Sequence, residues 1–400
     1  MPIISLEEIL RGGYVMKKSY LAAAAILGAA VFAGQAHAVK IDLGGGKSFK
    51  MGFRAKVHAI YAGKRDSAND KSDIYYAVKN ARIYGKGSIS KIFKWGFQGD
   101  FAGKIKDSNN DTIKFGVFKI VDAFVILDFA KEAKLYAGAI KVPFELHSGI
   151  QSGWSFIMPS GPAYELKNTG AGNPFANPAA EKIPGSGSRS PQVGIWGKVA
   201  GGMFKYYLYT VDGTNRSSNT DVKTGYGLRV EFAPTMAGYK GHPGYVLKET
   251  YLGKQNTLTV GLAYFTQDYG SGAKSQKSLG IDALWEQNLG TVTPNVNIGY
   301  VNHKDVGGTS GADVKGLIVQ GQVLLNQNTM LGKPAFGVRW AQSDPDGAKK
   351  ARVIGVVGQL YVKGVGNRIA LSIDSIKDDN ATGTAKSSYT DVTLALWYNF

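Results

Sequence analysis

The chain has 400 residues, no cysteine, 53 glycines, 21 tyrosines and a formal net charge of +17, with a mean hydropathy of −0.13. The absence of cysteine excludes a disulfide framework, a zinc ribbon and thiol chemistry. So strong a basic balance indicates an anionic partner. For an exported β protein, a small-anion pathway or contact with lipopolysaccharide explains it better than nucleic acid does. The alternative is that the lysines lie on loops and only solvate them.

The N-terminal region predicts export. The positive Met16-Lys17-Lys18 precedes an apolar, Ala-rich run at 21–34, and Ala36-His37-Ala38 is a small-x-small cleavage site. Residues 1–38 are therefore interpreted as upstream residues followed by a cleaved secretory signal. The residues before Met16 fit no pattern, so Met16 is the hypothesised start. Because residues 1–38 carry one net positive charge, the mature chain 39–400 has a net charge of +16.

Beyond the signal, short two-faced strands alternate with polar loops, and no apolar run reaches the length of a spanning helix. A period of two over about ten residues is typical of strands that cross a membrane with one face toward lipid. We predict about sixteen strands, at 48–63, 73–87, 93–105, 112–129, 133–143, 191–200, 203–212, 222–233, 257–267, 278–287, 293–303, 313–326, 334–343, 351–363, 366–376 and 387–400.

Short and long connections interleave along this series, as expected for periplasmic turns and external loops. The longest connection, 144–190, is the third long loop and contains five prolines and the apolar Trp154–Met158 segment. A loop this long is usually functional or disordered. We expect it to fold into the lumen as a constriction loop, the alternative being a flexible external loop. Residues 234–256 are long for the periplasmic side, so either the strand count is wrong by two there or this turn is a folded excursion.

The last strand ends the chain on an aromatic residue. Val392, Leu394, Leu396, Tyr398 and Phe400 share one face, and more polar residues and Trp397 share the other. This ending resembles the C-terminal signal of bacterial outer-membrane barrels. The sequence as a whole predicts an all-β protein, a transmembrane antiparallel barrel of about 16 strands in the outer membrane of a Gram-negative cell.

Five segments resemble the phosphate-selective porin O/P family. They are Lys94–Phe101, which ends in Asp-Phe; Val121–Val125, with its Asp-Ala-aromatic order; Ala139–Phe144, with basic-x-Pro-Phe; Arg189–Ile195; and Tyr251–Gly261. The resemblance covers most of the mature chain, in the right order and spacing. It implies a sixteen-stranded barrel, a homotrimer, and passage of anions by diffusion.

The chain departs from that family in two places. The second strand has Lys79-Asn80-Ala81-Arg82 where the family has a denser basic run, and loop 144–190 holds about as many acidic as basic residues. These departures put phosphate specificity in doubt and leave a preference for anions standing.

Strand alternation predicts which basic side chains face the lumen. An outward cation at the bilayer midplane would cost roughly 2–4 kcal/mol, so each is assigned to the water-filled side. Lys79 and Lys119 fall on the lipid side by strict alternation and indicate either bulges or interface positions. The pore-lining or anion-binding candidates are Lys50, Arg54, Lys56, Arg82, Lys114, Lys141, Arg189, Lys198, Lys205, Arg229, Arg339 and Arg368.

The sequence predicts a porin that passes small inorganic or organic anions, with phosphate as one candidate. A ring of Arg and Lys in a narrow aqueous lumen attracts anions, and the individual sites must be weak for the ion to leave. The alternative is a general diffusion porin with little anion specificity. No Gly-x-Ser-x-Gly, His-Glu-x-x-His or P-loop motif is present, so no enzyme activity, metal or cofactor is expected. The expected partners are anions, outer-membrane lipid and lipopolysaccharide, and not nucleic acid.

Overall fold

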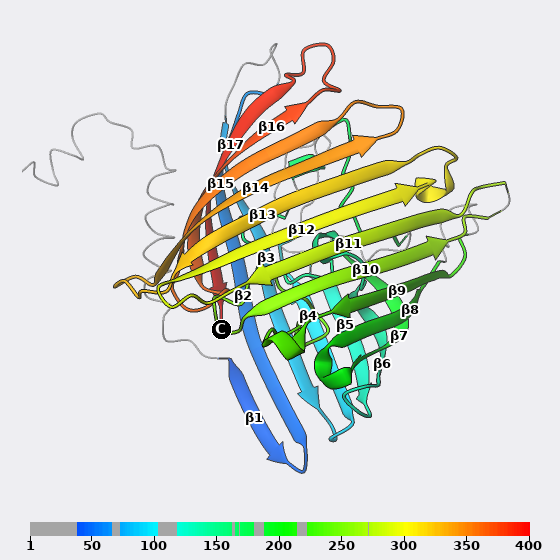
Figure 1. Cartoon of the computed structure of the whole chain (residues 1–400), viewed down its shortest axis with the longest axis vertical. Coiled ribbons are helices and arrows are strands. Elements are labelled where there is room, and N and C mark those ends of the chain that lie inside the picture. The colour runs from blue at the N-terminus through cyan, green and yellow to red at the C-terminus, as the bar shows by residue number, and fades with distance from the viewer. Residues whose placement is uncertain are drawn as a thin grey trace, which may run out of the picture. The chain divides into compact units, whose positions relative to one another are not determined.

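Sixteen antiparallel strands, β2 to β17, pair in chain order, and β17 pairs with β2 to close the sheet into a barrel (Figure 1). The computed structural model describes residues 38–65, 73–102, 118–161, 165–167, 169–179, 188–213, 222–270 and 272–400. The predicted signal at 1–38 lies outside these residues except for Ala38, and so does Lys114. The predicted barrel and its strand number are confirmed.

The strand boundaries lie within a few residues of the predicted ones for most of the barrel. The strands are β1 Val39–Gly44, β2 Lys47–Ala62, β3 Asp73–Ser88, β4 Phe93–Asp100, β5 Lys119–Asp128, β6 Lys134–Lys141, β7 Arg189–Val199, β8 Phe204–Val211, β9 Gly225–Phe232, β10 Thr257–Gln267, β11 Gln276–Glu286, β12 Val292–Lys304, β13 Val314–Leu325, β14 Lys333–Pro345, β15 Ala351–Tyr361, β16 Arg368–Asp378 and β17 Ser388–Asn399.

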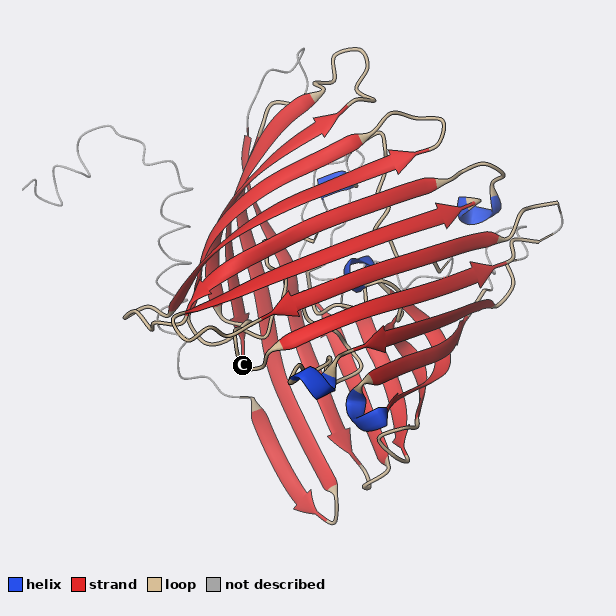
Figure 2. Ribbon diagram, viewed as in Figure 1, coloured by secondary structure: helices blue, strands red, loops and turns tan. Residues whose placement is uncertain are grey.

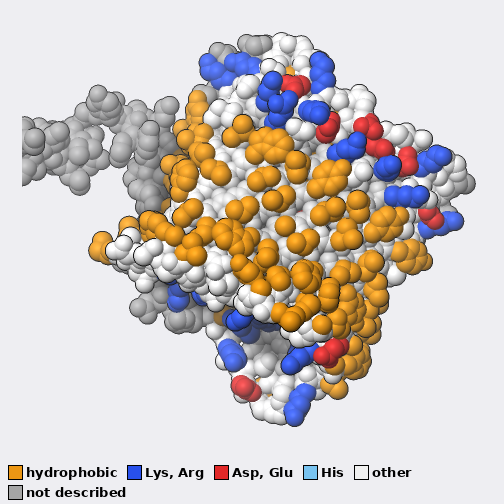
Figure 3. Space-filling model, in the orientation of Figure 1, with side chains coloured by type: hydrophobic (Ala, Val, Ile, Leu, Met, Phe, Trp, Pro, Cys, Tyr) orange, Lys and Arg blue, Asp and Glu red, His pale blue; other side chains and the backbone are white. Residues whose placement is uncertain are grey.

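Alternation of burial along each strand explains why the sequence forms this sheet. In β15, Val353, Val357 and Tyr361 are buried, whereas Ile354 between them is 58% exposed. Figure 3 shows hydrophobic side chains spread over the visible outer face and charged side chains gathered beyond it. An apolar outer face suits lipid, and closure leaves no unpaired strand edge within it.

Strand β1 is one element that the sequence analysis missed. It pairs with residues 47–51 of β2, along the same edge that β17 occupies at residues 54–61. The hairpin turns at Gly44 and Gly45, both with positive φ, a conformation that glycine adopts without strain. Strand β2 therefore continues beyond the end of β17, and β1 pairs with this additional part of β2.

The two predicted bulges are present. The register of β2 and β3 skips Lys79, since Lys56 pairs with Asn80 and the next residue, Val57, pairs with Val78. In β5 the register skips Val121, which places Lys119 opposite Asp100. An extra residue flips the alternation that follows it, so each bulge moves a lysine off the lipid-facing side.

Residues 233–256 connect β9 to β10 and contain only a short 3-10 helix, Thr235–Ala237, so the strand count holds and the turn is a folded excursion. Figure 2 shows that the helices of the described part are all short. None of them is long and apolar enough to cross a membrane. The other 3-10 helices are Leu146–Ser148, Ala200–Gly202 and Val306–Gly308.

Candidate functional site

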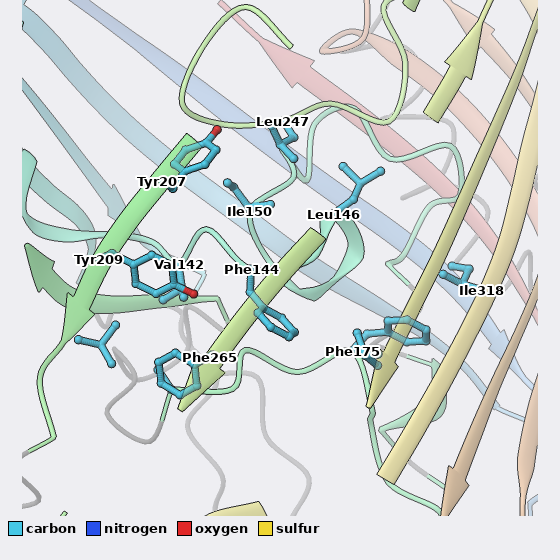
Figure 4. Close-up of a cluster of buried hydrophobic side chains, with 14 of the residues drawn as sticks. Val142, Phe144, Leu146, Ile150, Phe175, Tyr207, Tyr209, Leu247, Phe265 and Ile318 are labelled. Carbon is cyan, nitrogen blue, oxygen red and sulfur yellow. The ribbon is translucent and has the colours of Figure 1, made fainter. Parts of the chain in front are cut away.

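Two connections from opposite ends of the barrel meet each other. Gln151 of the long loop pairs with Leu247 of the excursion in a parallel bridge, and the Ser152 amide donates to the Leu247 carbonyl at 2.8 Å. The Ile157 amide donates to the Glu249 carboxylate at 2.8 Å. Apolar side chains of both segments, Leu146, Ile150 and Leu247, gather in one buried cluster with strand residues (Figure 4).

Strand side chains hold the long loop at several points. Lys56 on β2 donates to the Gly153 carbonyl at 3.0 Å, and Arg339 on β14 donates to the Ser160 carbonyl at 2.9 Å. Gln359 on β15 donates to the Ile157 carbonyl at 3.1 Å. These strands lie in one stretch of the closed sheet, from β14 through β17 to β2, so the loop backbone is held against this part of the wall.

A buried carboxylate organises the start of the loop. Glu145 accepts hydrogen bonds from the His147 amide at 2.8 Å and the Ser148 hydroxyl at 3.0 Å, and its other oxygen is 2.7 Å from His147 Nδ1. Burial, the largest single cause, would lower the pKa of His147, but the surrounding carboxylates, Glu145 foremost, together raise it. The nearby acids Glu249 and Asp282 act in the same direction.

We expect the His147–Glu145 pair to make stability depend on pH. Because the pKa of His147 is raised on folding, its contribution is complete below the unfolded value of about 6.5 and is lost as pH rises through the folded value. Unfolding of the wild type in urea, measured from pH 5.5 to 9, should show this loss. His147→Gln should remove it; an unchanged pH slope in the variant would contradict the assignment.

A cavity of about 1080 Å³ opens between the loop, the excursion and the walls formed by β2 to β7. Nine of its lining residues among the described part of the chain are basic, and Asp122 is the one carboxylate. The basic lining residues are Arg54, Lys56, Lys79, Arg82, Lys86, Lys141, Lys167, Arg189 and Lys248.

Like charges face each other across β2 and β3. Lys50 is the register partner of Lys86, and Arg54 is the register partner of Arg82. Opposed like charges destabilise a sheet. The Arg54 guanidinium is stabilised by stacking 4.1 Å from the centre of the Tyr84 ring. The arrangement concentrates positive charge on this part of the wall.

Several predicted arginines are paired with carboxylates. They are Arg82 with Asp100 at 2.6 Å, Arg189 with Asp122 at 2.5 Å, Arg229 with Asp282 at 2.5 Å and Arg339 with Asp374 at 2.8 Å. Pairing cancels most of the field of these arginines. The lysines and Arg54 therefore carry most of the net positive charge of the cavity.

Glycine on the intervening strand lets two of these pairs reach across. Gly355 of β15 is the register partner of both Arg339 and Asp374, and a Cβ there would lie 2.3 Å from the carboxylate. A Cβ at Gly261 would lie 2.3 Å from the Arg229 guanidinium. In both pairs the arginine and the aspartate lie two strands apart, and a side chain on the strand between them would block their contact.

The twelve candidates separate into three groups. Arg54, Lys56, Arg82, Lys141 and Arg189 line the cavity, and Lys114 lies outside the described residues. The others lie elsewhere on the inner side of the strands, where Lys205, for example, donates to the Gly244 carbonyl of the excursion at 2.5 Å. They are Lys50, Lys198, Lys205, Arg229, Arg339 and Arg368.

Four lining cations were not among the candidates. Lys86 could have been predicted, because alternation places it on the same face as Arg82. Lys79 could have been predicted too, because the expected bulge moves it off the lipid-facing side. Lys167 and Lys248 lie in connections without strand periodicity, where sequence patterning gives no direction for a side chain.

Known proteins support this architecture. Among solved structures, the anion-selective porin from Comamonas acidovorans is 15% identical, with 88% of this chain and 100% of that chain covered and a TM-score of 0.58. The outer membrane channel DcaP of Acinetobacter baumannii is 14% identical, with 90% and 99% covered and a TM-score of 0.56. Salmonella typhi OmpF, in complex with daunomycin, is 11% identical, with 90% and 100% covered and a TM-score of 0.56. At these identities the likeness establishes the fold.

No curated protein sequence matches the chain. The family model of the phosphate-selective porins O and P matches residues 49–258, which is more than half of the chain and includes the strands β3 to β9 and the long loop. The chain therefore belongs to the phosphate-selective porin O and P family and is an outer-membrane porin.

Proposed function

We propose that this porin passes small anions by diffusion and that its basic cavity sets the preference. The observation that carries the proposal is the ratio of nine basic residues to one carboxylate on the cavity wall. In a narrow aqueous path, fixed cations raise the local concentration of anions and exclude cations. The chain acts as a channel and not as an enzyme.

Residues 144–190 supply the constriction in this proposal. Their contacts with Lys56, Arg339 and Gln359 support a fixed position against the strands, and Gly149, Gly153 and Gly161 are among the residues that line the cavity. Lys141 at the start of the loop donates to the Gly149 carbonyl at 2.7 Å, which directs its charge toward the same space.

Phosphate is one candidate anion. Arginine can donate two hydrogen bonds to two phosphate oxygens at once, and lysine attracts phosphate as a point charge, so both residue types can bind phosphate. However, Arg82 and Arg189 already pair with Asp100 and Asp122. This favours a wall of weak point charges over a tight phosphate site. The proposal also includes export by a cleaved signal, assembly as a homotrimer, and contact with lipid and lipopolysaccharide.

Reversal potential in a planar bilayer tests the function. Under a tenfold gradient of potassium chloride, the sign of the potential should show that chloride crosses in preference to potassium. Block of the chloride current by low phosphate would identify an internal phosphate site. A reversal potential near zero without block would favour the alternative, a general diffusion porin whose charge lies mostly outside the path.

A further inference from the structure

Arg368 differs from the other buried arginines in having no carboxylate partner. Arg189, Arg229 and Arg339 are each buried and each contacts an aspartate. The Arg368 side chain, 1% exposed, donates only through Nη1, to the Gln359 amide oxygen at 2.9 Å and the Tyr361 hydroxyl at 3.1 Å. Its Nε and Nη2 have no hydrogen-bond partner among the described residues. An unpaired Nη2 is found in none of the other three.

Two neighbours of Arg368, Trp397 and His58, also have ring nitrogens without a hydrogen-bond partner among the described residues. Trp397 on β17 pairs in register with both Arg368 and Lys56. Its ring centre lies 4.0 Å from the Arg368 guanidinium and 4.9 Å from the Lys56 ammonium. The Trp397 indole nitrogen and both ring nitrogens of His58, 5.9 Å away between ring centres, lack partners within the described chain.

The cover over this cluster is apolar and uncharged. Trp154, Ile157 and Met158 of the long loop form one buried cluster with Trp397 and wall residues of β15 to β17. The segment from Ser152 to Gly161 contains no charged side chain. No carboxylate lies within ion-pair distance of Arg368 or Lys56 in the part of the chain that the structure describes. The Glu249 carboxylate acts on both cations only from beyond ion-pair distance. Two buried cations that no carboxylate contacts are unfavourable.

We infer that this cluster binds a small monovalent anion, a halide or a simple carboxylate, that stays with the folded barrel. The Nη2 and Nε donors of Arg368 and the Trp397 indole N–H would hold it, and Lys56 would add charge. Each of these groups is at least nine-tenths buried. Arg368 and Trp397 are absent from the lining of the basic cavity. Lys56 and His58 do line that cavity, so the site adjoins the cavity wall, and its anion stabilises the wall and the loop above it.

Bromide tests the site directly, because its anomalous scattering locates it in a crystal. Crystals grown in sodium bromide should show an anomalous peak within hydrogen-bond distance of Arg368 Nη2. A parallel crystal grown in formate should show electron density for formate at the same position. The absence of both the bromide peak and the formate density would overturn the inference. A peak on exposed lysines alone would mean an adventitious ion only.

A stability measurement tests the site in solution. At constant ionic strength, replacing gluconate with chloride should raise the melting temperature of the wild type by several degrees, since a ligand of the folded state stabilises it. The Arg368→Met variant should not show this chloride-dependent rise. The control, Arg339→Met, removes an arginine that is paired with a carboxylate; it should melt at a lower temperature in every salt but should still show the rise. Equal rises in the wild type and Arg368→Met would refute the site. Acetate and phosphate arms distinguish carboxylate and phosphate from halide.

These readouts do not depend on conduction. Reversal potentials of the wild type test the proposed pore function, whereas the bromide peak and the chloride-dependent melting test the buried site. A porin without anion selectivity could still hold the anion at Arg368, and a selective porin could lack it, so failure of one proposal is distinguishable from failure of the other.

Discussion

Replacing Lys79, Lys86 and Lys248 together with glutamate is expected to convert the proposed preference of the pore for anions into a preference for cations. All three line the cavity, from β3 and from the excursion. Reversing one charge at a distance of about 8 Å changes the energy of a monovalent ion by roughly 1 kcal/mol even in a water-like dielectric. Three reversals should therefore change the ratio of chloride to potassium permeability by at least about tenfold, since about 1.4 kcal/mol corresponds to a factor of ten.

A matched control separates the cavity from the overall charge of the protein. Lys277, Lys304 and Lys315 are exposed and lie near the loop ends of β11, β12 and β13. Their triple replacement by glutamate changes the net charge by the same amount. It should leave the reversal potential nearly unchanged at physiological salt, where charges more than about 8 Å away are screened. An equal effect of both triple variants would place the selectivity in the surface potential and not in the cavity.

The barrel could be predicted from the sequence because each strand carries its own evidence. In β10 to β17 the apolar residues recur at every second position, and polar loops separate the strands. Even the exceptions were informative, since a lysine on the wrong face, Lys79, marked a bulge that the structure contains. Strand β1 was missed because it is only six residues long and directly follows the segment predicted to be a signal.

The site was less predictable because its properties depend on contacts between distant residues. Alternation placed Arg229 and Arg339 inside but could not show that each reaches a carboxylate two strands away over a glycine. The excursion has no periodicity, so the approach of Leu247 to Gln151 could not be foreseen. As a result, several predicted cations are neutralised, and cations that were not predicted, such as Lys248, carry charge in the cavity.

Arg229→Met is expected to have the largest effect on stability. The Arg229 guanidinium is fully buried, donates to both oxygens of Asp282 at 2.5 and 2.8 Å, and donates to the Phe144 carbonyl at 2.8 Å. Glu231 lies 3.6 Å away. Methionine has a similar length and leaves the buried Asp282 carboxylate without the guanidinium that contacts it, which should lower the free energy of unfolding by about 3–5 kcal/mol. Urea unfolding in lipid vesicles measures this loss.

The double variant Arg229→Met with Asp282→Leu shows whether the loss comes from the uncompensated charge. Replacing a buried ion pair by apolar side chains of similar volume is often close to neutral, so the double variant should regain most of the stability. Arg352→Met is the control, because Arg352 is 45% exposed and lies 3.8 Å from Asp379. An exposed pair of this kind contributes only about 0–1 kcal/mol. If the double variant were as unstable as Arg229→Met, the hydrogen bond to Phe144, and with it the anchoring of the loop, would be the main contribution of Arg229.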